Sequence, residues 1–299
     1  MSDIIDNTLE RPMIIVTGAT GSLGSQIVTH LLERVPAEEI GVSVRDPHKA
    51  DHLAALGVRV RSGDFTDPAS LQHAFEGAEQ VLVVSAAIRG GGAFDANAAA
   101  IDAAVAAGAS RVLYTGHQAA ASDSLFSPQT VHAATQEHLA LAGVPFVALS
   151  NGFYASSLEI HLDRALASGT ISTPVDGPVS WTAHVDLAEA AVAVLLDPTV
   201  SGVTEPLTAS DALDLADVAV ILSDITGRRI VHEPMEDEAW KLAAIERGMP
   251  PMVAEFSLGM FLAARRGEFA VTSPALGTLI GRTPTPVRTV LQQLASVRG

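Results

Sequence analysis

The sequence predicts an α/β fold: a doubly wound parallel sheet followed by a smaller, mostly helical C-terminal lobe. Three observations predict it. Short apolar runs alternate with helical stretches in the first half, and a glycine-rich turn joins the first run to the first helix. Aromatic residues make up only 4% of the 299 residues, so small aliphatic side chains must fill the core, as in a sheet covered by helices.

Six strands are expected in the first half, because each run is short, β-branched or apolar. They lie at Met13–Thr17, Ile40–Val44, Val58–Arg61, Gln80–Ser85, Arg111–Thr115 and Phe146–Ser150. The helices expected between them are roughly Leu23–Arg34, Pro47–Leu56, Pro68–Phe75, Ala93–Ala107 and Thr130–Ala142. This alternation gives right-handed βαβ units and hence parallel strands. Asp67 is expected to cap the helix at Pro68, and Gly108 and Gly143 to end theirs.

After about Asn151 the pattern changes, and proline and glycine become frequent. Helices are expected at Leu187–Leu196, Leu215–Thr226, Glu236–Arg247, Pro251–Arg266 and Val287–Val297, with short strands at Glu205–Thr208 and Arg229–His232. Asp186 is expected to cap the first of these helices. It forms no metal site with His184, because no third ligand lies at a suitable spacing, so no metal is expected.

Composition narrows the functional classes. The net charge is −16 and the basic residues do not cluster, which argues against direct binding to nucleic acid or an acidic membrane. The chain has no cysteine, which excludes disulfides and thiol catalysis and fits a reducing compartment. Met1–Pro12 lacks the apolar stretch of a signal peptide, and runs such as Ala190–Leu196 are too short to span a bilayer. We expect a cytoplasmic protein.

The strongest motif is Thr17-Gly18-Ala19-Thr20-Gly21-Ser22-Leu23-Gly24, which follows a strand and opens a helix. Its glycines tighten the turn, let backbone amides approach a pyrophosphate and let the helix press against the sheet. The helix N-terminus adds unsatisfied N–H groups and positive potential. We expect Gly18, Thr20, Gly21, Ser22, Leu23 and Gly24 to hold the pyrophosphate of a nicotinamide cofactor. Residues 1–151 would form this NAD(P)-binding Rossmann-type domain, and residues 152–299 a substrate lobe that partly returns to the sheet.

Arg45 indicates which cofactor is bound. It lies 21 residues after Gly24, where an NAD-binding domain usually carries an acid for the ribose hydroxyl. A guanidinium binds a 2′-phosphate at two points, and Lys49 adds positive charge, so the sequence favours NADP(H). The alternative is that Arg45 is an exposed residue at a strand end, next to Asp46.

The Gly-x-x-Gly-x-x-Gly spacing resembles that of the short-chain dehydrogenase/reductase superfamily. Its usual catalytic pair is Tyr-x-x-x-Lys, in which the lysine lowers the pKa of the phenol. The two tyrosines here, Tyr114 and Tyr154, are followed four residues later by Gln118 and Leu158. The ordinary carbonyl-reduction mechanism is therefore excluded.

Four further motifs are VRDPHKA, GDFTDPASL, the HAATQE run that begins at His132 and the PFVALSNGFY run that ends at Tyr154. These segments resemble the NmrA-like group, and within it the type 2 NAD(P)H:quinone oxidoreductases. Relatives often carry an arginine about two residues before the glycine, where this chain reads Leu149-Ser150-Asn151, so a cationic contact is lost here. The resemblance implies cofactor contacts at Asp64 and Phe65 near the adenine, Ser85, Ala86 and Ala87 along the adenosine ribose and pyrophosphate, Thr115 and Gly116 near the nicotinamide ribose, and Asn151, Gly152 and Phe153 on the nicotinamide side. Asp64 fits a turn or helix cap equally well.

These observations favour an NADPH-dependent oxidoreductase that transfers hydride to a quinone or conjugated carbonyl, a small-molecule substrate. His117, His132 and Tyr154 are the candidate proton donors. His117 is preferred because strand ends face the cofactor crevice, whereas His132 fits helix packing and Tyr154 a pocket wall. Two alternatives stay open: a non-catalytic NADP(H)-sensing regulator, and a tailoring reductase for a polyketide-like substrate. A homodimer is also left open.

Overall fold

The computed structural model describes residues 13–86 and 92–296, and these fall into two compact units. The first unit takes the chain up to Thr115 together with Glu137–Ala148 and Leu195–Gly202. The second unit comprises Gly116–Gln136, Leu149–Val194 and the chain from Val203 onward.

A seven-stranded sheet forms the centre of the first unit, in the order β3-β2-β1-β4-β5-β6-β8. The strands are β1 (Met13–Thr17), β2 (Ile40–Val44), β3 (Arg59–Ser62), β4 (Ala78–Val83), β5 (Arg111–Thr115), β6 (Phe146–Leu149) and β8 (Gly202–Val203). β1 pairs in parallel with β2 and β4, and β2–β3 and β4–β5 are parallel as well. The order 3-2-1-4-5-6 is that of a doubly wound sheet, which confirms the predicted fold class.

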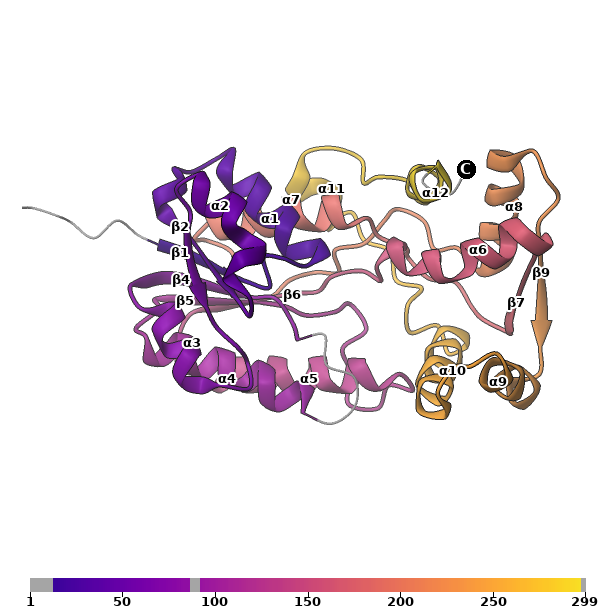
Figure 1. The fold of residues 1–299 in the computed structure, drawn as a ribbon, viewed down its shortest axis with the longest axis horizontal. Helices are drawn as coiled ribbons and strands as arrows, with labels where there is room; N and C mark the ends of the chain where they lie inside the picture. Colours follow the sequence, from indigo (N-terminus) through magenta and orange to yellow (C-terminus); the bar gives the residue numbers. More distant parts are fainter. Residues whose placement is uncertain (1–12, 87–91, 297–299) are drawn as a thin grey trace, which may run out of the picture. The chain divides into compact units, whose positions relative to one another are not determined.

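Helices cover both faces of this sheet (Figure 1). α1 (Ser22–Leu32) and α2 (Asp51–Ala55) lie on one face, and α3 (Pro68–Phe75) and α4 (Ala93–Ala106) on the other. Short 3₁₀ turns precede β2 and α2, at η1 (Ala37–Glu39) and η2 (Pro47–Ala50). Ile15, Val81 and Val112 of the strands are fully buried with Ala100 and Ala104 of α4, as expected where small side chains let a helix approach a sheet.

The predicted helix boundaries at Asp67, Gly108 and Gly143 are confirmed, because each depends on residues next to the helix end. The Asp67 carboxylate accepts hydrogen bonds from the amides of Ala69 (3.2 Å) and Ser70 (3.4 Å) at the start of α3. Gly108 and Gly143 have φ of +84° and +76°, the left-handed conformation in which glycine commonly ends a helix.

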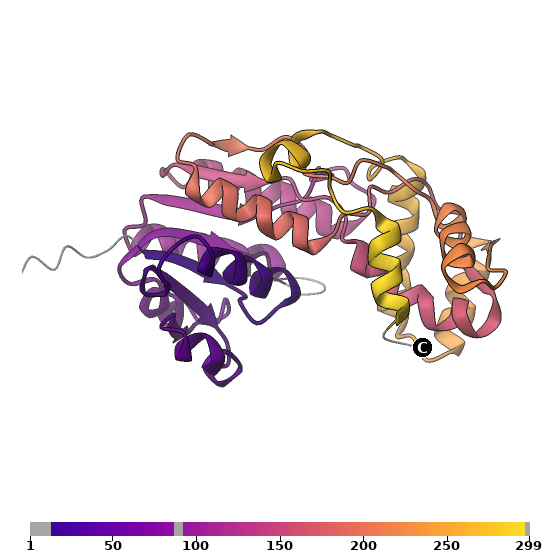
Figure 2. The same cartoon turned by 90° about the horizontal axis from the view of Figure 1, so that it is seen from above.

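The second unit is mostly helical and has a core of its own. Its elements are α5 (Ser127–Leu141) and α7 (His184–Leu196), whose last residues belong to the first unit, and η3 (Ala155–Leu158), α6 (Glu159–Ser168), α8 (Leu215–Thr226), α9 (Asp237–Glu246), α10 (Pro251–Arg265), α11 (Ala275–Ile280) and α12 (Val287–Ser296). β7 (Thr170–Pro174) and β9 (Val231–Met235) form a separate two-stranded parallel sheet. In Figure 2 the yellow helix α12 lies beside α6 and α8, which it contacts.

Two predictions for this part of the chain are wrong, and three of its elements were not predicted. Glu205–Thr208 is not a strand, since Leu207 makes an isolated bridge with Asn151. The unpredicted elements are α6, β7 and α11. Asp186 does not cap a helix, because α7 begins two residues earlier, at His184.

Asp186 instead forms a buried polar contact with a distant part of the chain. Its carboxylate accepts hydrogen bonds from the amide (2.6 Å) and hydroxyl (2.9 Å) of Thr285 and pairs with Arg282 at 2.7 Å. The side chain is fully buried, and these partners offset the cost of burying its charge.

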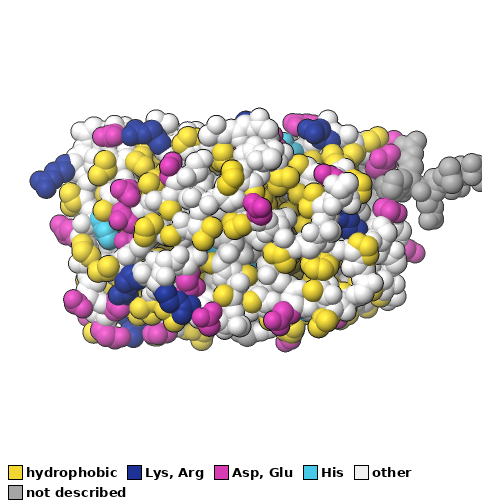
Figure 3. Space-filling model, turned by 180° about the vertical axis from the view of Figure 1, so that it is seen from behind, with side chains coloured by type: hydrophobic (Ala, Val, Ile, Leu, Met, Phe, Trp, Pro, Cys, Tyr) yellow, Lys and Arg dark blue, Asp and Glu magenta, His cyan; other side chains and the backbone are white. Residues whose placement is uncertain are grey.

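The described residues lack the structural features of the membrane and metal-binding classes that the sequence disfavours. No helix within the described ranges is long and apolar enough to cross a membrane. No cluster of three His, Cys, Asp or Glu side chains among those residues could hold a metal ion. On the face drawn in Figure 3, acidic side chains are scattered among the basic ones.

Candidate active site

The glycine-rich turn has the close backbone contacts that its sequence predicts. Gly18 has φ of +62°, and its carbonyl accepts a hydrogen bond of 2.9 Å from the amide of Gly21. A Cβ added at Gly24 would lie 2.7 Å from the carbonyl carbon of Gly18 and closer still to its oxygen. The first turn of α1 therefore sits directly on the backbone of Gly18, which requires glycine at position 24.

The start of α1 fits an anion. Its N-cap is Gly21, which has no side chain to satisfy the first-turn amides, and that turn contains no acidic residue. Thr20, Gly21 and Ser22 are exposed, whereas Leu23 is buried against the sheet. Amides and positive potential at a helix start suit a pyrophosphate, so these residues fit the diphosphate of a dinucleotide.

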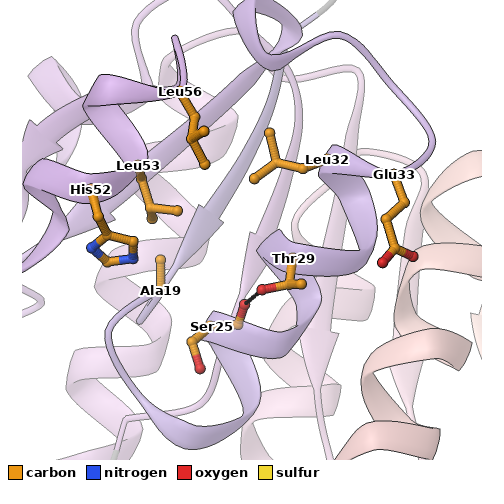
Figure 4. A pocket seen from close by; sticks show the side chains of 8 residues that line it. All are labelled: Ala19, Ser25, Thr29, Leu32, Glu33, His52, Leu53 and Leu56. Atoms are coloured by element: carbon orange, nitrogen blue, oxygen red, sulfur yellow. Dashed lines mark hydrogen bonds between the residues drawn. The ribbon is translucent and has the colours of Figure 1, made fainter.

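A hollow lies beside this turn, between α1 and α2 (Figure 4). Its lining is Ala19, Ser25, Thr29, Leu32, Glu33, His52, Leu53 and Leu56. Figure 4 shows Ala19 in the turn before α1 and the other side chains at the two helices, with the Thr29 hydroxyl hydrogen-bonded to the Ser25 carbonyl. The hollow adjoins the predicted pyrophosphate turn only through Ala19.

The positive charges predicted for the adenosine side are exposed. Arg45 directly follows β2, and Lys49 lies in η2. Asp64 forms a local turn, accepting hydrogen bonds from the amide (2.8 Å) and hydroxyl (2.7 Å) of Thr66. These bonds are the main reason that the pKa of Asp64 lies below its usual value, with a smaller contribution from the charge of Arg45. Phe65 packs against the core of the first unit.

Side chains secure the backbone just after β4. The amide of Ser85 donates to the buried Thr115 hydroxyl at 2.8 Å, and the amide of Ala86 donates to the Asn97 side chain at 2.8 Å. These two hydrogen bonds fix the backbone of Ser85 and Ala86 at the carboxyl end of the sheet, where doubly wound folds bind ligands. The predicted contact at Ala87 lies outside the described residues.

His117 belongs to a cluster of rings in the second unit. Its ring centroid lies 6.0 Å from that of His132, 5.6 Å from Phe153 and 5.9 Å from Phe269. Phe126 extends the cluster, 6.3 Å from Phe153 and 6.1 Å from Phe269. The structure therefore brings together two of the three predicted proton donors and one residue predicted for the nicotinamide side.

Both histidines of this cluster are neutral near pH 7. Burial, with a smaller effect from His132, holds the pKa of His117 well below 6.5. Burial also lowers the pKa of His132 to about 4. The amide of Ala119 donates to Nδ1 of His117 at 3.1 Å, so the neutral ring carries its proton on Nε2. His117 is thus an N–H donor among apolar rings.

Tyr154, the third candidate, contacts a different histidine. Its ring centroid lies 4.3 Å from that of His184, which is 3.4 Å from the Ser156 hydroxyl. Burial raises the pKa of Tyr154, and the Asn151 side chain beside its hydroxyl works in the opposite direction. The phenol stays protonated at neutral pH and can donate a proton.

Two glycines of the predicted nicotinamide side stand in crowded positions. A Cβ at Gly116 would lie 2.7 Å from Nε2 of Gln136 and 3.2 Å from the carbonyl oxygen of Leu149. A Cβ at Gly152 would lie 3.0 Å from Cβ of Thr182 and 3.1 Å from the carbonyl oxygen of Leu207. Neither position has room for a side chain unless its neighbours shift.

The sequence profile of the NmrA-like family matches residues 10–269. The chain is 30% identical over 286 residues to quinone oxidoreductase 2 of Escherichia coli, covering 95% of this chain and 99% of that protein. It is 30% identical over 279 residues to NAD(P)H azoreductase of Xenophilus azovorans, covering 93% and 95%. The solved complex of Citrobacter triphenylmethane reductase with NADP(H) has a TM-score of 0.88 at 34% identity, covering 94% and 99%.

The chain therefore belongs to the NmrA-like family, as its motifs predicted. The predicted class of activity, NAD(P)H-dependent oxidoreduction, agrees with these relatives, which are named as oxidoreductases or reductases. The sequence did not single out Phe126, Gln136 or Phe269 as site residues. Gln136 carried the one available signal, a position one helical turn after His132.

Proposed function

We propose that the protein is an NADPH-dependent oxidoreductase that reduces quinones or other conjugated acceptors. The observation that carries the proposal is His117, a neutral imidazole with its proton on Nε2, set among Phe126, Phe153 and Phe269. Flat apolar rings suit a flat conjugated acceptor, and a buried N–H donor suits the oxygen on which its negative charge develops.

The chain's own residues would bind and orient the cofactor. The turn Gly18–Gly24 holds the pyrophosphate, and Arg45 with Lys49 holds the 2′-phosphate of NADP(H). Asn151, Gly152 and Phe153 lie on the nicotinamide side, with Thr115 and Gly116 near its ribose. When bound, NADPH supplies a hydride from C4 of its nicotinamide ring.

Reduction of a quinone to a hydroquinone requires one hydride and one proton. Conjugation stabilises the product oxyanion, so a Tyr-x-x-x-Lys pair is not needed. His117 donates a hydrogen bond from Nε2 to the oxygen on which negative charge develops, and it keeps its proton because a neutral imidazole that lost it would become an imidazolate. The proton comes from water or from Tyr154, whose phenol stays protonated, and His132 keeps the ring of His117 in place by stacking.

The test is to follow NADPH oxidation by the purified protein with benzoquinones, naphthoquinones, azo dyes and triphenylmethane dyes. We expect saturable turnover with at least one quinone and slower turnover with NADH. Absence of turnover with every acceptor, while NADPH binds, would favour the sensing regulator. Turnover only with bulky polyketide-like ketones would favour the tailoring reductase.

The other expectations stay predictions of the same proposal. They are a cytoplasmic location and no direct binding to nucleic acid or membrane. A homodimer is compatible with them. Sedimentation at several protein concentrations measures the oligomeric state directly.

A further inference from the structure

The carboxylate of Glu268 holds a turn of the second unit that lies far from it in sequence. Its Oε1 accepts a hydrogen bond of 3.1 Å from the amide of Leu125, and its Oε2 accepts one from the Ser124 hydroxyl. That hydroxyl itself accepts the amide of Phe126 at 3.1 Å. The hydroxyl has one hydrogen to donate, and the charged carboxylate is a stronger acceptor than the Phe126 carbonyl at 3.3 Å. Glu268 therefore holds two successive amides, one directly and one through Ser124.

Arg266 reinforces the contact between Glu268 and this turn. Its Nη2 lies 2.7 Å from Oε1 of Glu268 and donates to the carbonyl of Asp123 at 2.6 Å. The Glu268 side chain is 10% exposed, whereas that of Arg266 is 40% exposed. Charge-assisted hydrogen bonds are roughly twice as strong as neutral ones, and they are screened less where water is excluded. The turn Asp123–Phe126 is thus tied firmly to Glu268.

The end of α10 determines where Glu268 stands. The helix ends at Arg265, and Gly267 follows with φ of +79°. The amide of Glu268 donates to the carbonyl of Ala263 at 3.1 Å, and the amide of Gly267 donates to that of Ala264 at 2.9 Å. These two bonds form a Schellman motif, which ends a helix at a left-handed glycine. The backbone of Glu268 is therefore fixed by the helix end, and its side chain reaches the turn from a rigid base.

The turn that Glu268 holds carries one ring of the proposed acceptor site. The ring centroid of Phe126 lies 6.3 Å from that of Phe153 and 6.1 Å from that of Phe269. It also lies 5.0 Å from Phe256 of α10. Contacts between aromatic rings depend on their separation and tilt, so any movement of the turn changes the surface that these rings offer to a flat acceptor.

The imidazole of His117 is held by different bonds. The amide of Ala119 donates to its Nδ1 at 3.1 Å, and Nε2 of the neighbouring Gln118 donates to the Ser180 hydroxyl at 2.8 Å. Neither bond involves Glu268. Loss of the Glu268 carboxylate should therefore loosen the phenyl wall of the site and leave the imidazole donor in place.

We propose that Glu268 is a positioning residue of the acceptor site, which holds the turn Asp123–Phe126 and so sets the ring of Phe126 against Phe153 and Phe269. This inference rests on the proposed function, because it presumes that the acceptor binds among these rings. The pyrophosphate turn Gly18–Gly24 belongs to the first unit, so affinity for NADPH should not depend on Glu268.

The experiment compares the full-length wild-type protein with Glu268→Gln, which keeps the size of the side chain and removes its charge. Initial rates with NADPH and menadione, or benzoquinone if it reacts faster, give kcat and the KM of the acceptor. We expect Glu268→Gln to raise that KM about 10-fold and to change kcat less than about 2-fold, because charge-assisted bonds to the turn are lost. Calorimetric titration should show unchanged NADPH affinity.

Amide hydrogen exchange tests the hold on the turn without any turnover. The amides of Leu125 and Phe126 should exchange about 10-fold faster in Glu268→Gln, because their hydrogen bonds are weakened. Ser124→Ala breaks only the link to Phe126 and should raise the acceptor KM as well. Combining it with Glu268→Gln should add little, since both variants interrupt the same chain of bonds.

Asp237→Asn is the matched control. It removes an ion pair at the same end of α10, where the Asp237 carboxylate meets Arg265 at 2.8 Å and 2.9 Å. This pair does not involve the turn Asp123–Phe126. We expect wild-type values for the acceptor KM and for amide exchange in the turn.

The outcomes separate this inference from the proposed function. Unchanged amide exchange in Glu268→Gln would overturn the inference. An unchanged acceptor KM with a lower midpoint of thermal unfolding would also overturn it, because Glu268 would then have a purely structural role. Equal losses of acceptor and NADPH affinity would do the same. Absence of turnover by the wild-type protein, with faster exchange in the variant, would instead refute the proposed function. If Glu268→Gln does not fold, Ser124→Ala replaces it, with the same expected direction.

Discussion

Replacing Gly24 with alanine tests whether the first turn of α1 must sit on the backbone of Gly18. The added Cβ would lie 2.7 Å from the carbonyl carbon of Gly18 and 3.1 Å from Cα of Ala19. Both are backbone atoms, so no side-chain rotation relieves the overlap and the turn must open. Overpacking of this kind typically costs about 1–3 kcal/mol. Alanine offsets at most about 1 kcal/mol of it through its higher helix propensity.

Gly21→Ala is the matched control in the same motif. Its Cβ would lie 3.3 Å from the carbonyl oxygen of Gly18, and its φ of −91° suits any residue. Alanine is a poorer N-cap than glycine, so we expect a loss of about 1 kcal/mol at most. The two variants thus differ in how much the turn must move, although both lie within the predicted pyrophosphate site.

Urea unfolding and calorimetric titration with NADPH measure both effects. We expect Gly24→Ala to be the less stable variant and to bind NADPH at least about 10-fold more weakly than wild type, because the amides lose their alignment. We expect Gly21→Ala to retain most of both properties. Wild-type stability and affinity in Gly24→Ala, or a larger loss in Gly21→Ala, would refute the reasoning.

Three further predictions concern charge and protonation. Arg45→Ala should weaken NADPH about 10- to 100-fold and leave NADH affinity unchanged, because one charge-assisted contact to the 2′-phosphate is lost; equal losses for both cofactors in the titration would contradict this. His117→Phe should lower kcat for quinones about 100-fold with unchanged NADPH affinity, because the hydrogen bond to the developing oxyanion is lost, and an unchanged kcat would exclude this role. Stability should fall below about pH 6.5, because burial lowers the pKa of both His132 and His161 to about 4 and the unfolded chain then binds more protons. Each neutral histidine contributes up to about 3 kcal/mol to the free energy of unfolding, present in full above pH 6.5 and lost towards pH 4. Urea unfolding across this range should show a smaller loss of stability in His161→Gln than in wild type.

The sequence predicts the first unit well because its determinants are local. Strand–helix alternation and the cap at Asp67 can be seen within a few neighbouring residues, and they place β1 to β6 nearly at their observed positions. β7 could not be predicted in this way, since its partner, β9, lies some 60 residues later. The role of Asp186 was misjudged for the same reason, because Arg282 and Thr285 reach it from far along the chain.

The same distinction applies to the site. The pyrophosphate turn is contiguous in sequence, so its geometry could be predicted residue by residue. The ring cluster around His117 draws Phe126, Phe153 and Phe269 from separate segments, and only the fold brings them together. The protonation of His117 also depends on that packing, because burial is the main reason that its pKa is low.

The central claim is that the opening turn binds a nicotinamide dinucleotide and that Arg45 selects its 2′-phosphate. Calorimetric titration of the unmodified protein with NADPH and then NADH tests it most directly. We expect saturable heat with NADPH and an affinity at least about 10-fold weaker for NADH. No heat with either cofactor, or tighter binding of NADH, would contradict it.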